Sequence, residues 1–403
     1  MAPLEPWEKV FINLGRRDNV GEIDYHLAEF SCVDCHGGKS DQFNNMEKAH
    51  TGLIKDPSEY HLLDGENNSC GGASNCHNAI VSEYKNSLHQ QLWGEKRMVA
   101  LRFGVDNFEA CPTETQVGYS GECTSCHATC GDCHISIPNS AGQGFISSHR
   151  FRKTPDQSNN CTACHGSRIA HDFYGDAETG RKGDIHFEKF MDCLDCHTQA
   201  EMHTGITDTE NTHRYNYDLA PSCTQGCHTD SVALEVRNIY HVQHFADLTC
   251  HVCHSQPTYN NCTGCHVKNE WQTDPVYQAN NPVEDFKIGL NPLPGHSNAK
   301  YATLRHIPIA PDSYSNWGPV SANIPAYDTR ETWKFTTPHN IRRFTALTDT
   351  TGGVGCMASC HPYQGSDNRD YFLFRNFIQS EWGNEVDANR NVVVDDDLPP
   401  LWR

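Results

Sequence analysis

Residues 123–134 read CTSCHATCGDCH, so that the pattern C-x-x-C-H occurs twice with two residues between the copies. This pattern is the signature of a c-type haem attachment site. Each cysteine sulfur bonds a vinyl group of the haem, and the histidine that follows binds the iron from one face. Two haems tethered this closely have to lie face to face or edge to edge. The stretch therefore predicts a fold arranged around neighbouring haems.

Ten sites of this kind are spread along the chain, and we number them 1 to 10 in chain order. Seven have the C-x-x-C-H spacing: Cys32, Cys35 and His36; Cys123, Cys126 and His127; Cys130, Cys133 and His134; Cys161, Cys164 and His165; Cys193, Cys196 and His197; Cys250, Cys253 and His254; Cys262, Cys265 and His266. Two have a C-x3-C-H spacing, Cys223, Cys227 and His228, and Cys356, Cys360 and His361, and one has C-x5-C-H, Cys70, Cys76 and His77. We predict a thioether at each cysteine and a proximal iron ligand at each histidine, which makes ten haem c groups per chain.

The cysteine count favours haem over two alternatives. The chain has 21 cysteines, of which the ten sites use 20 and leave Cys111, which we expect to be a buried thiol. A disulfide framework would not place a histidine after every second cysteine. A zinc site needs four ligands, with cysteine pairs matched to other pairs, and seven copies of C-x-x-C-H in one chain disfavour it.

Histidine gives an independent count. The chain has 25 histidines, and the ten proximal ones leave 15 for the second face of each iron. Many of the 15 precede an attachment site by a few residues, as His26 precedes Cys32, which suggests duplicated haem-binding units. We predict distal ligands among twelve of them: His26, His50, His61, His89, His149, His186, His203, His213, His241, His244, His306 and His339. The weaker candidates are His171, His251 and His296.

The supply of ligands also predicts the redox range of the haems. Methionine ligation raises the potential of a haem, and the chain has only six methionines for ten irons. A supply rich in histidine therefore predicts low-potential haems with two histidine ligands each.

Composition points to an unusual core. The hydrophobic fraction is 37 % and the mean hydropathy is −0.66, so the chain has little apolar surface for a conventional core. We expect a haem-cored fold of mostly irregular coil with short α-helices and little β-structure, in an elongated multihaem architecture. The site spacing suggests three segments: 1–110 with two haems, 111–270 with seven, and 271–403 with one. Within the last, residues 279–355 are rich in proline and asparagine, and we expect a long, irregular, haem-free wrap.

Charge and motifs exclude several classes of function. A net charge of −20 disfavours nucleic acid and anionic membranes as partners. No apolar run reaches the length of a transmembrane helix. Because covalent haem attachment takes place outside the cytoplasm, we expect an extracellular or cell-surface protein whose signal peptide is absent from this numbering. No phosphate-binding loop, H-E-x-x-H or nucleophile elbow occurs, so we predict no catalytic residues.

The amino-acid sequence around several of these sites is similar to that of one group of proteins. The stretches NCTACHGSRIAHDFYG (160–175), GDIHFEKFMDCLDCHTQAEMHTG (183–205) and YHVQHFADLTCHVCHSQPTYNNCTGCH (240–266) resemble secreted multihaem c-type cytochromes of metal-reducing bacteria and archaea. The resemblance covers roughly residues 26–270. It implies a chain of mostly bis-histidine haems in alternating parallel and T-shaped pairs. Some such proteins polymerise into cytochrome nanowires.

These observations predict an electron carrier rather than an enzyme. We expect extracellular electron transfer along the ten haems, with copies of the chain joined head to tail as a conductive filament. Other redox proteins or extracellular acceptors such as metal oxides are the expected partners. The alternative is a multihaem reductase for nitrite, hydroxylamine or tetrathionate with one open haem, although no C-x-x-C-K site occurs. A storage role for haem is disfavoured because closely spaced sites serve transfer.

Overall fold

The computed structural model describes residues 32–42, 44–54, 56–58, 70–71, 76–126, 128–138, 141–142, 144–146, 149–206, 213–229, 239–261, 283–349, 359–361, 367–381 and 383–399. Several of the expected haem-site residues lie outside these ranges: His26, His61, His127, His266, Cys262, Cys265 and Cys356.

The chain forms two compact units, each built from separate stretches of sequence. Unit 1 comprises Met1–Trp93, Gly121–Gly166 and Cys193–Asn211, and unit 2 comprises Gly94–Ser120, Ser167–Asp192 and Thr212–Arg403. These boundaries differ from the three contiguous segments that we expected. The reason is that side chains meet across long sequence separations: His203 follows site 6, yet it pairs with His134 of site 4.

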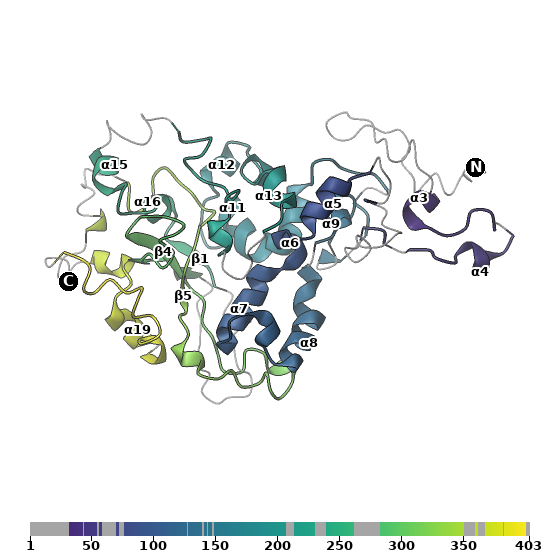
Figure 1. The fold of residues 1–403 in the computed structure, drawn as a ribbon. Helices are drawn as coiled ribbons and strands as arrows, with labels where there is room; N and C mark the ends of the chain where they lie inside the picture. The colour runs from purple at the N-terminus through teal and green to yellow at the C-terminus, as the bar shows by residue number, and fades with distance from the viewer. Residues whose placement is uncertain are drawn as a thin grey trace. The chain divides into compact units, whose positions relative to one another are not determined.

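Unit 1 consists of short helices joined by loops (Figure 1). Its elements, with η for a 3-10 or π helix, are α3 (Cys32–His36), α4 (Met46–Ala49), α5 (Asn78–Tyr84), α6 (Leu88–Gln91), η3 (Cys123–Cys126), α9 (Cys130–His134), η5 (Gln157–Cys161), α10 (Thr162–His165), η7 (Cys193–Asp195) and α13 (Gln199–His203). Side-chain caps mark the N-termini of several of these helices. Thr129 and Asp132 form a capping box at α9, and the Thr198 side chain accepts from the backbone N–H of Glu201 at α13, so that N–H groups without helical partners are satisfied.

Unit 2 contains the longer helices and the strands. Its helices are α7 (Trp93–Phe103), η2 (Phe108–Ala110), α8 (Thr113–Glu122), η6 (Gly166–Ala170), α11 (His171–Tyr174), α12 (Ile185–Glu188), η8 (Arg214–Asn216), α15 (Ile239–His244), α16 (Cys250–His254), η9 (Ser315–Trp317), η10 (Tyr327–Thr329), η11 (Asp367–Tyr371), α19 (Arg375–Glu381) and η12 (Gly383–Glu385). Its strands are β1 (Thr258–Asn260), β2 (Val283–Asp285), β3 (Lys287–Leu290), β4 (Tyr301–His306) and β5 (Trp333–Phe335). The bounds of α7, α8 and η6 each cross a unit boundary by one or two residues.

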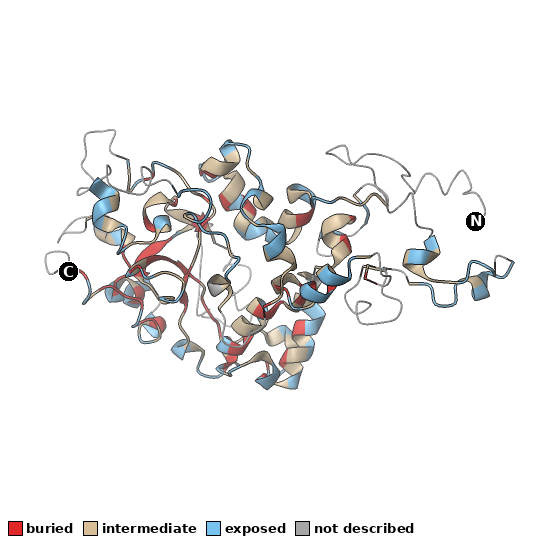
Figure 2. Cartoon of the chain, turned by 45° about the horizontal axis from the view of Figure 1, so that its top comes forward, coloured by how far each residue is buried: buried red, intermediate tan, exposed pale blue. Residues whose placement is uncertain are grey.

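A small apolar core lies around the sheet of unit 2. Strands β3, β4 and β5 pair antiparallel in that order, and most of their residues are buried (Figure 2). One cluster joins Leu304, Trp333 and Ile378. A second joins Val252 of α16 to Ile288 and Phe374, so that the helix of site 8 is anchored on the sheet.

The segment 279–355 differs from our expectation of an irregular wrap. It contains β2 to β5 and much of the buried core. The strands are short and the chain between them is rich in proline, so composition alone did not reveal them. The described residues are about 40 % helical and 10 % strand, and the helices are short. The haem core and the elongated form stay predictions.

Part of this segment packs on helices α7 and α8. The Tyr314 ring stacks on Phe103 of α7 with centroids 5.9 Å apart, and Glu114 of α8 accepts hydrogen bonds from the backbone N–H groups of Val320 and Ser321. Gly118 of α8 lies under Trp317, where an added Cβ would be 2.2 Å from the indole. Two haem-free parts of the chain thus cover each other. Cys111, between these helices, is buried as expected.

Candidate haem sites

The attachment motifs lie mostly on single helical turns. At sites 1, 4 and 8 a helix begins at the first cysteine and ends at the histidine: α3, α9 and α16. Residues three and four apart share one face of a helix, so both cysteines and the histidine face the same side. The structure has no disulfide among the 18 cysteines that it describes.

The longer C-x5-C-H motif is closed by a backbone hydrogen bond. The N–H of His77 donates to the carbonyl of Cys70 at 2.9 Å. This hydrogen bond brings Cys70 close to the Cys76–His77 pair. Site 2 can thus present both sulfurs and its histidine together despite the spacing.

Six of the eight proximal histidines that the structure describes each face one histidine from outside the motifs. The ring centroids are 6.0 Å apart for His36 and His149, 6.1 Å for His134 and His203, 6.2 Å for His165 and His89, 6.1 Å for His228 and His186, 6.1 Å for His254 and His241, and 5.9 Å for His361 and His244. Every free histidine in these pairs is among the twelve distal candidates. Both C-x3-C-H sites, 7 and 10, have such a pair, and so do sites 1, 4, 5 and 8 with the C-x-x-C-H spacing.

This spacing fits one iron atom between two imidazoles. A metal–imidazole bond is about 2 Å long, and a ring centroid lies roughly 1 Å behind the bonding nitrogen. Two rings on opposite faces of one metal ion therefore have centroids about 6 Å apart by this geometry. The porphyrin supplies the other four ligands of a haem iron, so a pair of histidines is all that the protein has to provide.

Hydrogen bonds at Nδ1 hold several of these rings so that Nε2 is left to bind iron. The Nδ1 atoms of His36 and His134 lie 2.8 and 2.6 Å from the carbonyl oxygens of Ile54 and Arg152. At His254 the partner is the carbonyl of Arg342, at 3.2 Å. A hydrogen bond at the ring nitrogen that does not bind the metal fixes the tautomer and orientation of a metal-ligating histidine.

Carboxylates take the same role at two other rings. The Nδ1 of His186 lies 2.8 Å from Asp184, and that of His197 lies 3.0 Å from Glu201. The hydrogen bond that the ring donates to Asp184 raises the pKa of His186. Burial lowers the pKa of His197, but Glu201 outweighs it and the pKa is raised. A carboxylate at Nδ1 makes the imidazole a more basic ligand.

Burial keeps one distal ring neutral. Burial and the neighbouring His165 lower the pKa of His89 to about 4. The neutral imidazole is the form that binds a metal, so His89 is ready for ligation at neutral pH.

Apolar side chains are exposed beside the paired histidines. Phe145 is 52 % exposed with its ring 4.4 Å from that of His149, and Val242 and Phe245 flank His244 at 64 % and 51 % exposure. Large exposed apolar groups in a cluster mark a binding surface. A porphyrin face would cover them.

Some sites lie close together through their cysteines. Cys130 of site 4 raises the pKa of the Cys70 thiol of site 2, and Cys223 of site 7 lowers the pKa of the Cys250 thiol of site 8. The side chains of each pair are therefore close to each other. Sites 2 and 4 are neighbours although site 3 lies between them in the sequence.

Four other distal candidates are described and have different surroundings. His306 is 3 % exposed, stacks on Trp333, and has its Nε2 2.9 Å from a carboxylate oxygen of Glu385. His213 accepts a hydrogen bond at Nδ1 from the N–H of Tyr215, which leaves the proton on Nε2 in the neutral ring. His50 is exposed at the end of α4. His339 is half-buried near His251.

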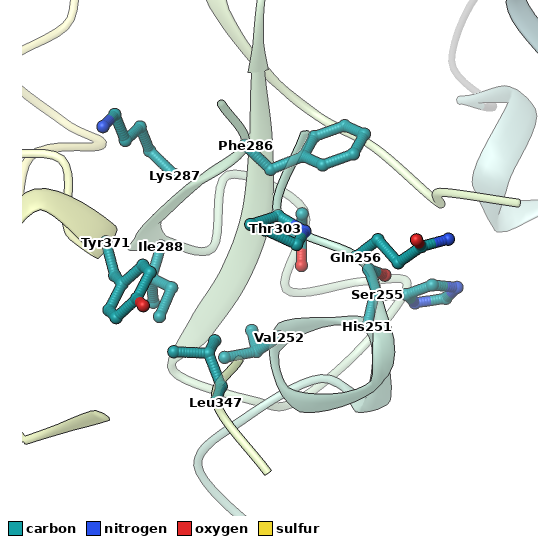
Figure 3. A pocket seen from close by; sticks show the side chains of 11 residues that line it. His251, Val252, Ser255, Gln256, Phe286, Lys287, Ile288, Thr303, Leu347 and Tyr371 are labelled. Atoms are coloured by element: carbon teal, nitrogen blue, oxygen red, sulfur yellow. The ribbon is translucent and has the colours of Figure 1, made fainter. Parts of the chain in front are cut away.

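A small pocket lies beside the helix of site 8. Its lining includes Val252, Ser255 and Thr303, and Figure 3 shows the His251 ring turned away from it. The hydroxyls of Ser255 and Thr303 are buried with no hydrogen-bond partner among the described residues. The free space is about 20 Å³, which is room for one water molecule. This pocket is too small for a substrate.

Comparisons with known proteins add no relative. No protein-family model, curated protein or solved structure matches the chain. In the described part of the chain, no helix is both long and apolar enough to cross a membrane. Within the same residues, no three His, Cys, Asp or Glu side chains are grouped to hold a metal ion by themselves.

Proposed function

We propose that this chain is a multihaem c-type cytochrome that carries electrons along ten covalently attached haems without transforming a substrate. The observation that carries the proposal is the set of six histidine pairs. Each joins one attachment motif to one free histidine, with ring centroids 5.9 to 6.2 Å apart. Irons closed on both faces by histidine transfer electrons at low potential.

Contacts between sites support transfer from haem to haem. The cysteines of sites 2 and 4, and those of sites 7 and 8, lie close enough to shift each other's pKa, so haems attached there would be neighbours. Tunnelling rates fall steeply with distance, so neighbouring haems would form a relay. A single active site does not require ten haems.

The test of ligation compares two histidines that differ in their surroundings. His241→Ala removes a histidine that faces His254 at site 8, whereas His50→Ala removes an exposed one. We expect one high-spin ferric haem per chain in the electron paramagnetic resonance (EPR) spectrum of the first variant and none in the second. A spectrum of His241→Ala identical to that of the unmodified protein would overturn the proposal for this site.

The reductase alternative requires a haem with one open face. The six paired sites are closed by histidine on both sides, which leaves sites 2, 3, 6 and 9 for an open iron. We expect the oxidised protein to show no stoichiometric high-spin signal, and no turnover of nitrite, hydroxylamine or tetrathionate beyond that of free haem. Turnover at about 1 to 10³ per second, the ordinary range of enzymes, would replace the carrier with a reductase.

The filament is the finer part of the proposal. A head-to-tail contact that does not close gives an open polymer, and we propose copies of the chain, other redox proteins and extracellular acceptors such as metal oxides as its partners outside the cell. Residues 314–321 pack on α7 and α8 of their own chain, so the polymer contact has to use other surfaces. Negative-stain microscopy of native material should show fibres, and compact particles alone would leave a soluble carrier.

A further inference from the structure

One of the six histidine pairs has a different ring geometry. At sites 1, 5, 7, 8 and 10 the planes of the two imidazoles cross at 71°, 87°, 67°, 65° and 74°. At site 4 the planes of His134 and His203 are only 13° apart, so they are nearly parallel. Site 4 therefore stands apart from the other five.

A backbone hydrogen bond orients one ring of site 4. The Nδ1 of His134 lies 2.6 Å from the carbonyl of Arg152. Since a hydrogen bond at Nδ1 lies in the ring plane, this carbonyl defines the plane of the His134 ring. The Nδ1 of His203 is buried with no hydrogen-bond partner among the described residues, so the plane of the His203 ring depends on packing.

Tyr84 supports the ring of His203 from the side. Tyr84 ends α5, is 7 % exposed, and its ring lies 6.3 Å from that of His203 at 61°. Its hydroxyl donates to the carbonyl of Ala128, which fixes the phenol. Rotation of the His203 ring toward a crossed arrangement would press it against this phenol.

Close packing of α13 on α5 keeps the two residues together. The N–H of Ile206 donates to the carbonyl of Asn86 at 2.9 Å. A Cβ added at Gly205 would be 2.5 Å from the Cβ of Asn86, so no larger residue fits there. The position of His203 relative to Tyr84 is thus set by the backbone.

The angle between axial imidazoles changes the electronic structure of a ferric haem. Parallel rings donate into the same iron d orbital, which separates it in energy from its partner and gives a rhombic low-spin EPR signal. Crossed rings donate into both orbitals equally, which leaves them nearly degenerate and gives one broad, highly anisotropic signal. Parallel donation also stabilises the ferric state and lowers the potential.

We propose that the haem at site 4 is electronically distinct from those at the other five paired sites, with Tyr84 as the positioning residue that keeps its ligand planes parallel. The inference rests on the proposed function, because it assumes haem at these sites. Site 4 would have the lowest potential of the six and would form an energetic step in the relay. Electrons reach it last during reduction and leave it first during oxidation.

Ligand variants assign the signal. We expect the rhombic component to lose the intensity of one haem in His203→Met and to be unchanged in His149→Met, which alters site 1. In a redox titration followed by EPR, this component should be the last of the six to disappear. A rhombic signal that survives His203→Met, or one that disappears first, would overturn the assignment.

Variants of Tyr84 test the positioning role. Tyr84→Phe keeps the ring and should keep the rhombic signal, whereas Tyr84→Leu should convert it to the broad type and raise the potential of that haem. Tyr119→Leu is the matched control, because Tyr119 is likewise a buried tyrosine and its ring packs on Phe108. An unchanged signal in Tyr84→Leu would refute the role of Tyr84. Intact mass separates these outcomes from a failure of the proposed function, since a chain without haem would give no signal at all.

Discussion

The replacement His306→Ala separates a structural histidine from an iron ligand. His306 is one of the twelve distal candidates, but its ring is buried between Trp333 and Glu385. The centroids of His306 and Trp333 are 5.0 Å apart at 22°, and Nε2 lies 2.9 Å from Glu385, which is itself 1 % exposed. Thr332 donates a hydrogen bond to the same carboxylate oxygen. The variant removes a ring from a packed core and leaves a buried charge short of one partner.

The expected loss of stability in His306→Ala follows from these two changes. Truncating a buried aromatic side chain costs about 3–5 kcal/mol, and removing one partner of a buried pair costs about 3–5 kcal/mol. Both losses occur at one place, so they overlap rather than add. We expect the free energy of local unfolding around β4 and β5 to fall by about 4 kcal/mol, which accelerates amide exchange by about 10³-fold.

Hydrogen–deuterium exchange of peptides that contain 301–306, 333–335 and 385–394 measures this change. Lys300→Ala is the control, because its ion pair with Asp397 is 45 % exposed on both sides and such a pair contributes less than about 1 kcal/mol. The haem spectrum should be unchanged in both variants. A new high-spin haem in His306→Ala, or exchange rates equal to those of the control, would refute the structural role of His306.

Three further predictions concern the haems and the sheet. Intact mass under denaturing conditions should correspond to ten haems, and a mass with seven would mean that sites 2, 7 and 10 are empty. Glu201→Ala should raise the potential of the haem at site 6 in a redox titration, because the carboxylate 3.0 Å from Nδ1 of His197 stabilises the ferric iron; a potential equal to that of the exposed control Glu47→Ala would contradict this. Gly289→Ala should destabilise the sheet by about 1–3 kcal/mol, since the added Cβ would lie 2.2 Å from Leu304 and 2.6 Å from the carbonyl of Val392. Gly383→Ala, with nothing within 4 Å, should leave amide exchange in the sheet unchanged.

The attachment sites could be predicted from the sequence, but the partners of their histidines could not. A motif such as C-x-x-C-H is local, and each of its residues has a chemical reason to be there. Pairing is a tertiary property: His89 faces His165, 76 residues later, and His244 faces His361, 117 residues later. No spacing rule connects such residues. The angle between two rings depends on neighbours such as Tyr84, which no motif marks.

The sheet of unit 2 was missed for a different reason. Residues 301–306 read YATLRH, a short run with alternating apolar side chains, but the prolines and asparagines around it dominated the composition. The same reasoning made His306 a ligand candidate, because the sequence does not show the neighbours of a histidine. The structure adds the buried Glu385, 79 residues further on, whose carboxylate lies 2.9 Å from Nε2 of His306.

Helix α15 has a consequence for how the chain tolerates change. Its six residues carry both His241 and His244, which face the histidines of sites 8 and 10. Those two sites are 107 residues apart in the sequence. Under the proposed ligation, a proline at position 242 would remove the second ligand of two irons at once, so a change in this one turn would affect both sites.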